Sequence, residues 1–183
     1  MTPRNRLPGP LSPPVLTRRH CLQAGVSCLL GAAGSGARAL DKPMGPVVLT
    51  VSGRVRQVNQ GASAHFDMAM LEAIQQQSIS TKTPWFAQAR RFTGPLLRDV
   101  LALAGAHGSM LRLIALNDYR VDMPMDDAQR HDVLLARLID DKPMTVRDKG
   151  PLFVIYPFDS KPELRSAVYF SRSAWQLRTI EVL

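Results

Sequence analysis

The sequence predicts an α+β domain: a mixed β-sheet with two or three helices. Short stretches rich in β-branched residues recur along residues 40–183, and turn signals separate them. Apolar residues follow helical spacing in only a few places, of which residues 95–104 are the clearest. Strands and helices do not alternate strictly, and this order favours α+β over a repeated βαβ arrangement.

The first elements lie between residues 47 and 83. Residues 47–55 predict a strand interrupted at Ser52-Gly53. Asp67 is placed to cap a short apolar helix that runs to Ile74. Residues 78–83 predict a second strand, which Pro84 ends.

A helix is expected to open at Phe92-Thr93-Gly94-Pro95. Pro95 suits the first helical position, where its missing N–H removes no hydrogen bond. Gly105 is a natural end for this helix. The residues expected on its apolar face are Leu96, Leu97, Val100, Leu101, Leu103 and Ala104.

The remaining chain predicts a hairpin and several short strands. Residues 110–116 and 120–125 flank the turn signal Asn117-Asp118-Tyr119, and they predict a β-hairpin. Asp126 and Asp127 begin a loop or helical turn. Further strands are expected over residues 133–139, 152–156, 167–170 and 176–182, with a turn at 140–143.

Residues 1–39 have the composition of a cleaved signal peptide. A modestly apolar stretch, residues 21–33, follows a polar segment that bears arginines. This stretch is shorter than the about 20 residues that a membrane-spanning helix needs. Ala37-Arg38-Ala39 matches an A-x-A cleavage pattern. We therefore expect a periplasmic protein with residues 1–39 as the signal peptide and residues 40–183 as one domain.

The signal resembles the twin-arginine type. Thr17, Arg18, Arg19 and Leu22 fit that pattern, whereas Cys21 and Gln23 depart from it. An ordinary export signal with an accidental arginine pair is the alternative. We favour the twin-arginine route, which carries proteins that have already folded.

Charge and cysteine content restrict the function of residues 40–183. Five arginines and no acidic residue lie in residues 1–39, so the domain carries only +3 of the chain's formal +8. This charge gives no electrostatic case for a nucleic-acid partner. Cys21 and Cys28 are the only cysteines, and both lie before residue 40. The domain is therefore expected to have no disulfide and no thiolate metal ligand.

Five motifs follow one another from Phe92 to the last strand. They are Phe92-Thr93-Gly94-Pro95-Leu96-Leu97, Asn117-Asp118-Tyr119, Leu134-Leu135-Ala136 with Pro143-Met144, Lys149-Gly150-Pro151-Leu152 with Tyr156-Pro157, and Arg172 to Trp175. Their order resembles the oxidoreductase molybdopterin-binding domain family, which has the sulfite-oxidase fold. The resemblance implies this fold, a pterin cofactor and a molybdopterin-dependent oxidoreductase.

The sequence departs from this family at the residues that carry its chemistry. The family's molybdenum-binding cysteine falls in the region of Ser80 to Trp85, where this chain has no cysteine. Serine and threonine hydroxyls replace a thiolate poorly. Lys149-Gly150 stands where the family has His-Gly, and Phe153 stands where it has an arginine. We therefore expect no molybdenum, although a molybdopterin could still bind.

The resemblance implies a ligand pocket, whose catalytic residues stay unassigned. The candidate cofactor-binding residues are Thr83, Trp85, Asn117, Asp118, Tyr119, Lys149, Gly150, Arg172 and Trp175. Each has a simpler explanation. Trp85 could pack on the sheet, Asp118 could serve the turn alone, and Arg172 could be a solvated residue on an edge strand.

No metal site is expected from the histidines. His65, His107 and His131 fall in separate predicted loops, and only His131 has possible ligands nearby, Asp127 and Asp132. The leading hypothesis is a periplasmic ligand-binding or pterin-binding protein that is an accessory or sensory member of the family. A small anionic or pterin-like ligand and a membrane redox or signalling partner are expected. The alternative is a functional molybdopterin-dependent oxidoreductase that passes electrons to a membrane partner.

Overall fold

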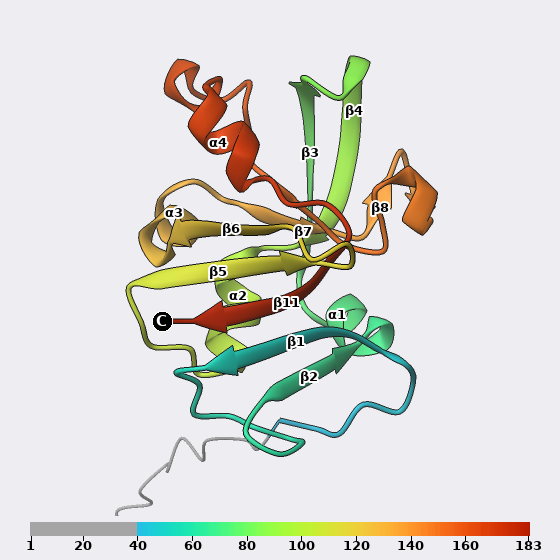
Figure 1. Cartoon of the computed structure of the whole chain (residues 1–183). Helices are drawn as coiled ribbons and strands as arrows, with labels where there is room; N and C mark the ends of the chain where they lie inside the picture. The colour runs from blue at the N-terminus through green and yellow to red at the C-terminus, as the bar shows by residue number, and fades with distance from the viewer. Residues whose placement is uncertain (1–39) are drawn as a thin grey trace, which may run out of the picture. The chain divides into compact units, whose positions relative to one another are not determined.

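The computed structural model describes residues 40–183 (Figure 1). The predicted signal peptide, its twin-arginine motif and both cysteines lie outside the described residues. The helices are α1 (Met68–Ala73), α2 (Leu97–Leu103), α3 (Met125–Arg130) and α4 (Ala167–Arg172), with two short 3-10 turns at Val146–Asp148 and Pro162–Leu164. None of the helices in residues 40–183 is both long enough and apolar enough to cross a membrane.

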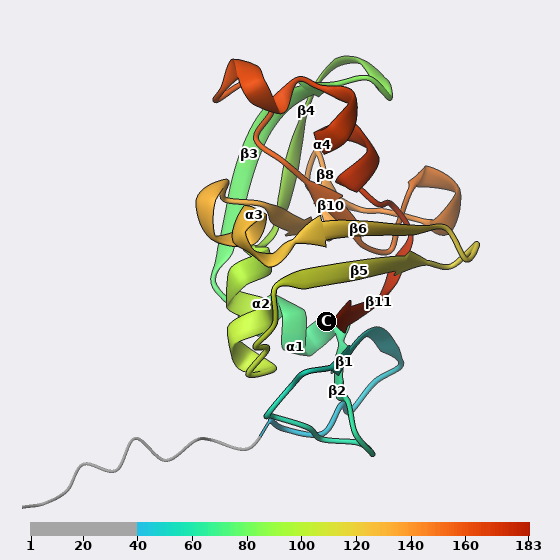
Figure 2. The same cartoon turned by 60° about the vertical axis from the view of Figure 1, so that its left-hand side comes forward.

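A five-stranded mixed sheet forms the body of the domain. Its order is β2 (Ala64–Asp67), β1 (Val47–Gly53), β11 (Leu177–Val182), β5 (Met110–Ala115) and β6 (Arg120–Pro124). β1 pairs with β11 in parallel, and the other neighbours are antiparallel. α1 and α2 cover one face, so their apolar side chains and those of the sheet form one buried cluster (Figures 1 and 2). The predicted α+β class with a mixed sheet is confirmed.

A second group of strands extends from this body. β3 (Gln76–Thr83) and β4 (Phe86–Pro95) form a long hairpin, which β8 (Leu138–Ile139) and β9 (Lys142–Pro143) extend (Figure 2). β7 (Leu134–Ala136) pairs separately with β10 (Phe153–Ile155). Phe92, Phe153 and neighbouring side chains form the second buried cluster of the domain.

β7 lies between the two buried clusters. Leu135 belongs to the cluster under the five-stranded sheet, whereas Leu134 and Ala136 belong to the cluster under the hairpin. Side chains alternate between the two faces of a strand, so three consecutive apolar residues serve two cores. β4 approaches β7 closely at Gly94, where an added Cβ would lie 2.1 Å from the Leu135 carbonyl oxygen.

Several local predictions are confirmed. The Asp67 carboxylate accepts a hydrogen bond from the Met70 N–H at 2.8 Å and caps α1. This bond comes first among the backbone hydrogen bonds that lower the pKa of Asp67. β5 and β6 form the predicted hairpin, and Asp118 adopts φ 63° in its turn. Gly105, with φ 60°, follows the last turn of α2 as predicted.

The expected helix start at Phe92 to Pro95 is wrong. These residues end β4, where Phe92 pairs with both Ile79 and Ile139. Helix α2 begins only at Leu97, whose N–H donates to the Val133 carbonyl at 2.8 Å. Burial of Phe92 between two neighbouring strands outweighs the preference of a Pro for the first helical turn. Leu103, expected on the apolar face, is 45% exposed.

Residues 133–139 do not form one strand. Leu134–Ala136 pairs with β10, and Leu138–Ile139 pairs with β4. The change of partner occurs at Arg137, whose N–H donates to the Thr93 carbonyl at 2.9 Å. The Arg137 guanidinium donates to Gln76 and Glu72, both at 2.9 Å.

Residues 167–170, expected as a strand, belong to helix α4. No strand among the described residues pairs with this segment, so its β-branched and aromatic residues have no sheet to join. Ser166 precedes the helix with extended backbone, and the Ser173 hydroxyl donates to the Tyr169 carbonyl. Local propensity for a strand is overridden here by tertiary context. His65, expected in a loop, lies in β2.

Replacing Gly94 by alanine should destabilise the domain by about 2 kcal/mol or more, because the new Cβ would force β4 away from β7. Gly45→Ala is the matched control, since a Cβ there would meet its nearest atom at an ordinary 3.5 Å. Urea unfolding of both variants measures the difference. Equal midpoints for the two variants would show that the close approach at Gly94 contributes nothing.

Candidate functional site

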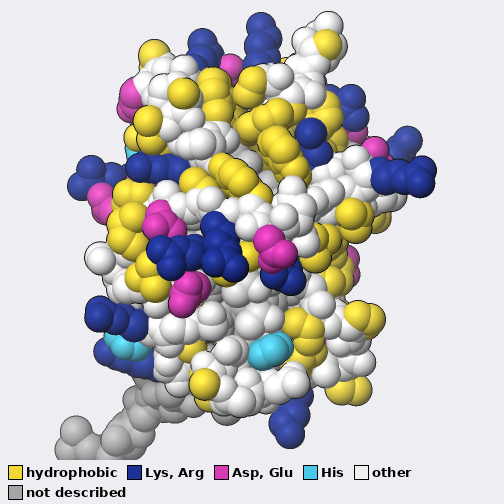
Figure 3. All heavy atoms as spheres, in the orientation of Figure 1, with side chains coloured by type: hydrophobic (Ala, Val, Ile, Leu, Met, Phe, Trp, Pro, Cys, Tyr) yellow, Lys and Arg dark blue, Asp and Glu magenta, His cyan; other side chains and the backbone are white. Residues whose placement is uncertain are grey.

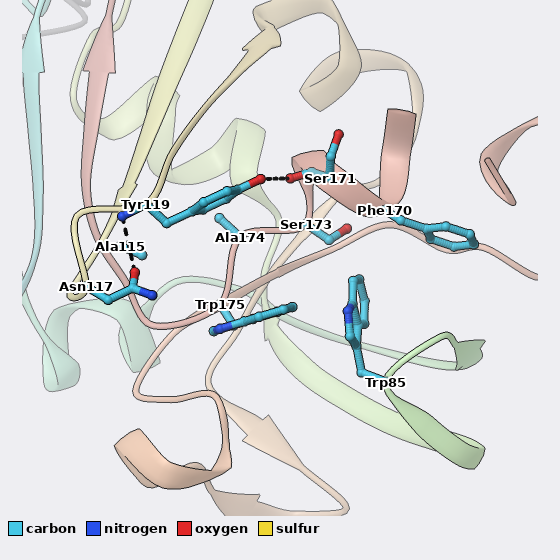
Figure 4. Close-up of a pocket in the computed structure, with 9 residues that line it drawn as sticks. All are labelled: Trp85, Ala115, Asn117, Tyr119, Phe170, Ser171, Ser173, Ala174 and Trp175. Carbon is cyan, nitrogen blue, oxygen red and sulfur yellow. Dashed lines mark hydrogen bonds between the residues drawn. The ribbon is translucent and has the colours of Figure 1, made fainter. Parts of the chain in front are cut away.

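A cavity of about 350 Å³ lies where α4, the β5–β6 turn and the tip of the β3–β4 hairpin meet (Figure 4). Its volume falls at the low end of small-molecule sites. Hydrophobic side chains gather on this part of the surface (Figure 3). The cavity, called the aromatic pocket below, is lined by Trp85, Ala115, Asn117, Tyr119, Phe170, Ser171, Ser173, Ala174 and Trp175.

Two tryptophans from distant parts of the chain form one wall of the aromatic pocket. Trp85 comes from the turn between β3 and β4, and Trp175 precedes β11. Their ring centroids lie 5.5 Å apart with an interplanar angle of 79°. Phe153 lies behind both rings, at 5.3 Å from Trp85 and 6.1 Å from Trp175. The hydrophobic cores of both clusters therefore hold this wall in place.

The opposite wall comes from the β5–β6 turn and α4. The Asn117 side-chain oxygen accepts from the Tyr119 N–H at 3.2 Å, which orients the turn. The Tyr119 hydroxyl donates to the Ser171 carbonyl at 3.1 Å and joins the turn to α4 (Figure 4). This single bond spans one side of the pocket, and the Tyr119 side chain remains half-exposed.

The aromatic pocket is uncharged. None of its lining residues is acidic or basic, and both serine hydroxyls donate to carbonyls within their own helix, Ser171 to Val168 and Ser173 to Tyr169. Among residues 40–183, neither the indole N–H of Trp85 nor that of Trp175 has a hydrogen-bond partner. The pocket therefore offers flat apolar surfaces and a few neutral donors, which suit a flat heterocycle.

Four of the nine candidate residues line this pocket: Trp85, Asn117, Tyr119 and Trp175. Asp118 lies outside it and pairs with Arg178 at 2.6 Å. Gly150 is buried, and a Cβ there would lie 2.1 Å from the Met144 carbonyl, so close packing explains the glycine.

Lys149 lies at the edge of the site. Its ammonium is 4.3 Å from the centroid of the Trp175 ring, although it does not line the pocket itself. Its backbone has a left-handed φ of 72°, so the predicted turn at this position is a tight one.

Thr83 lines a neighbouring groove instead. This groove is held by Asp159, which accepts from the Lys82 N–H at 2.8 Å and from Arg165 at 2.8 Å. The Lys82 bond is the main reason why the pKa of Asp159 lies below its ordinary value. The Thr83 hydroxyl is buried, with no hydrogen-bond partner among the described residues.

Arg172 is neither an edge-strand residue nor a pocket residue. Its guanidinium pairs with Asp127 of α3 at 2.9 Å and lies over the Tyr169 ring. The same carboxylate oxygen accepts from the buried Tyr156 hydroxyl at 2.7 Å. Arg172, Asp127 and Tyr156 therefore fix α4 against α3 and position the helix that lines the pocket.

The pocket also contains Ala115, Phe170, Ser171, Ser173 and Ala174, which were not among the candidate cofactor-binding residues, although Ser173 and Ala174 lie within the motif Arg172 to Trp175. Phe170 lies in the segment 167–170, which was expected as a strand and is part of helix α4. The one local signal for a helix was Ser166, a residue type that favours N-cap positions, directly before Ala167.

The residues present do not fit a molybdenum centre. In the region of the family's cysteine, the Thr81 hydroxyl accepts from the Asp159 N–H at 3.1 Å and the Thr83 hydroxyl is unpartnered. Neither is the soft anionic donor that such a centre needs. Within residues 40–183 no group of three or more His, Asp or Glu side chains is arranged to hold a metal. No cation lines the pocket to meet a pterin phosphate.

Replacing Tyr156 by phenylalanine should lower stability by about 1 kcal/mol at pH 7, because a buried hydrogen bond is lost. Burial, and then the bond to Asp127, raises the pKa of Tyr156 above its ordinary value. The unfolded chain ionises this tyrosine near pH 10 while the folded chain keeps it neutral, so this contribution is lost as pH rises above about 10.

Thermal unfolding between pH 8 and 11 checks this prediction. The variant should lose stability less steeply above pH 10 than the wild-type protein. Tyr119→Phe is the control, since it removes a tyrosine hydroxyl from a half-exposed side chain. A Tyr156→Phe slope equal to that of wild type contradicts the prediction.

Comparison with known proteins gives the family. A model of the oxidoreductase molybdopterin binding domain matches residues 54–182. The sulfane dehydrogenase SoxCD from Paracoccus pantotrophus is similar in structure, with a TM-score of 0.54, 15% sequence identity and coverage of 73% of this chain and 37% of that chain. The likeness shows the sulfite-oxidase-type fold, and this chain spans little more than a third of that relative. A search of curated proteins found no match. The family match covers well over half of the sequence, and the chain belongs to the oxidoreductase molybdopterin-binding domain family.

Proposed function

We propose that this chain is an exported, ligand-binding member of its family that works without a molybdenum centre. The aromatic pocket carries the proposal. It sets two tryptophans around a space of about 350 Å³ and contains no charged or metal-binding side chain. Such a pocket can bind and orient a flat ring, and its lining contains no thiolate to hold molybdenum.

The ligand proposed is a pterin or a similar flat heterocycle. Family membership suggests a molybdopterin. A flat ring could lie against Trp85 or Trp175, with the unpartnered indole N–H groups available for ring nitrogens or carbonyls. The Asn117 side chain could add a further polar contact from the opposite wall.

We also propose that the protein acts in the periplasm. The support is the sequence of residues 1–39, with Arg18-Arg19 and the A-x-A pattern that ends at Ala39. There the domain would serve as an accessory or sensory partner of a membrane redox or signalling protein. A ligand-dependent change in the surface formed by α4 and the β5–β6 turn is how such a partner would read the occupied state.

A working molybdopterin-dependent oxidoreductase is the second candidate. The family match over residues 54–182 favours it. Metal analysis of the full chain purified from the periplasm separates the two candidates. One molybdenum per chain, together with turnover of an oxygen-transfer substrate, would overturn the ligand-binding proposal.

Trp175→Leu should weaken the binding of pterin about tenfold, because one stacking surface is lost. Isothermal titration calorimetry with pterin measures this effect, and thermal unfolding verifies the fold of the variant. The matched control is Val168→Ala, an exposed residue of α4 that does not line the pocket. Equal affinity for pterin in wild type and in Trp175→Leu would refute the assignment of this pocket as the binding site.

A further inference from the structure

Strand β3 forms one edge of the four-stranded sheet, so one side of its backbone faces no other strand of residues 40–183 (Figure 2). The direction of its peptide groups follows from β4. The Arg91 carbonyl of β4 accepts from the Asp140 N–H, on the side where β8 lies. The neighbouring Phe92 therefore directs its peptide groups to β3, where it pairs with Ile79.

The open part of this edge is centred on Ser78 and Ser80, the two neighbours of Ile79. Peptide groups alternate between the two sides of a strand, so both serines direct their N–H and C=O groups away from β4. Within residues 40–183, no group outside the β3–β4 pair bonds to these backbone atoms. Both serine side chains are exposed. Further along β3, the Lys82 N–H donates to the Asp159 carboxylate at 2.8 Å, and this bond ends the open part.

The open part lacks the features that usually protect an edge strand. Such strands commonly carry charged residues, a proline or a bulge, which prevent pairing with another chain. From Gln76 to Thr81 the strand has no charged residue and no proline. Its register with β4 shifts only between Thr81 and Thr83. The backbone around Ser78 and Ser80 is therefore a regular template for a further strand.

We propose that a second copy of this chain pairs with this edge, β3 against β3 in antiparallel orientation. A two-fold axis brings the same surface of both copies together. The register centred on Ile79 uses all of the free groups, because Ser78 then forms a hydrogen-bonded pair with the partner's Ser80. The hairpin sheets of the two copies become one continuous sheet. This dimer goes beyond the proposed function and does not depend on the ligand of the aromatic pocket.

The side chains of β3 match those of a second copy in this register. Ile79 is the only apolar residue of β3, and it lies on the axis, in a non-hydrogen-bonded pair with the partner's Ile79. Side chains in such a pair contact each other, with Cβ atoms about 5 Å apart. Ile79 is only partly buried within its own chain, so this contact covers it further. Lys82 falls opposite the partner's Gln76, and no like charges face each other along the two strands.

Sedimentation equilibrium of the full chain tests the dimer. The wild-type chain should sediment with twice the mass of one chain and dissociate on dilution. In Ser78→Glu/Ser80→Glu each new carboxylate lies opposite a carboxylate of the other copy, so the dimer dissociation constant should rise at least about tenfold. In the matched variant Ser78→Lys/Ser80→Glu the same register sets each ammonium opposite a carboxylate, and the dimer should persist.

Three results overturn the β3 dimer. One is a wild-type chain that stays monomeric at the highest concentration reached. Another is association that persists unchanged in Ser78→Glu/Ser80→Glu, which would place the contact elsewhere. The third is loss of the dimer in both double variants, which would exclude this register. Thermal unfolding shows whether each variant is folded.

A crosslink tests the axis with a smaller change. Cys21 and Cys28, the only cysteines of the chain, are first replaced by serine. Ile79→Cys then brings two thiols together across the axis, and mild oxidation should link most chains in pairs. Ala62→Cys, an exposed position next to β2 in the other sheet, is the control and should stay largely unlinked. Equal linking at the two positions would indicate random collision and refute the pairing.

Discussion

The close contact between β4 and β7 at Gly94 is the constraint on which the domain depends. β7 has only three residues, yet its side chains enter both buried clusters. The approach of β4 to the Leu135 carbonyl packs the hairpin that carries Trp85 directly against β7. The two buried clusters therefore pack on opposite faces of the same strand, β7. A side-chain change that shifts β7 would alter the packing of both clusters.

The elements that the sequence predicted well are those fixed by short-range chemistry. The Asp67 cap, the Asn117-Asp118-Tyr119 turn and the left-handed Gly105 each depend on residues within a few positions. The wrong predictions concern segments whose secondary structure depends on contacts with residues far away in the sequence. Phe92 to Pro95 belong to a strand because Ile79 and Ile139 flank Phe92. Residues 167–172 form a helix and, within the described part of the chain, pair with no strand.

The contrast between local signals and long-range contacts also explains which site residues could be predicted. Asn117, Tyr119 and Trp175 belong to the motifs whose order implies a shared pocket, and Trp85 lies in the region of the family's cysteine. The fold assembles the four residues from three distant segments. Arg172 was misplaced because its partner, Asp127, lies on a different helix, and the pairing leaves no local mark in the sequence.

The position of Lys149 makes two cavities interdependent, the aromatic pocket and a neighbouring cavity that Lys149 itself lines. One flexible ammonium serves as a neighbour to both, so an occupant that draws it away from Trp175 changes the surface offered to a ring. Linkage of this kind is reciprocal: the factor by which the first molecule alters the affinity of the second equals the factor by which the second alters that of the first. Two molecules that bound in these cavities would therefore be coupled through the Lys149 ammonium.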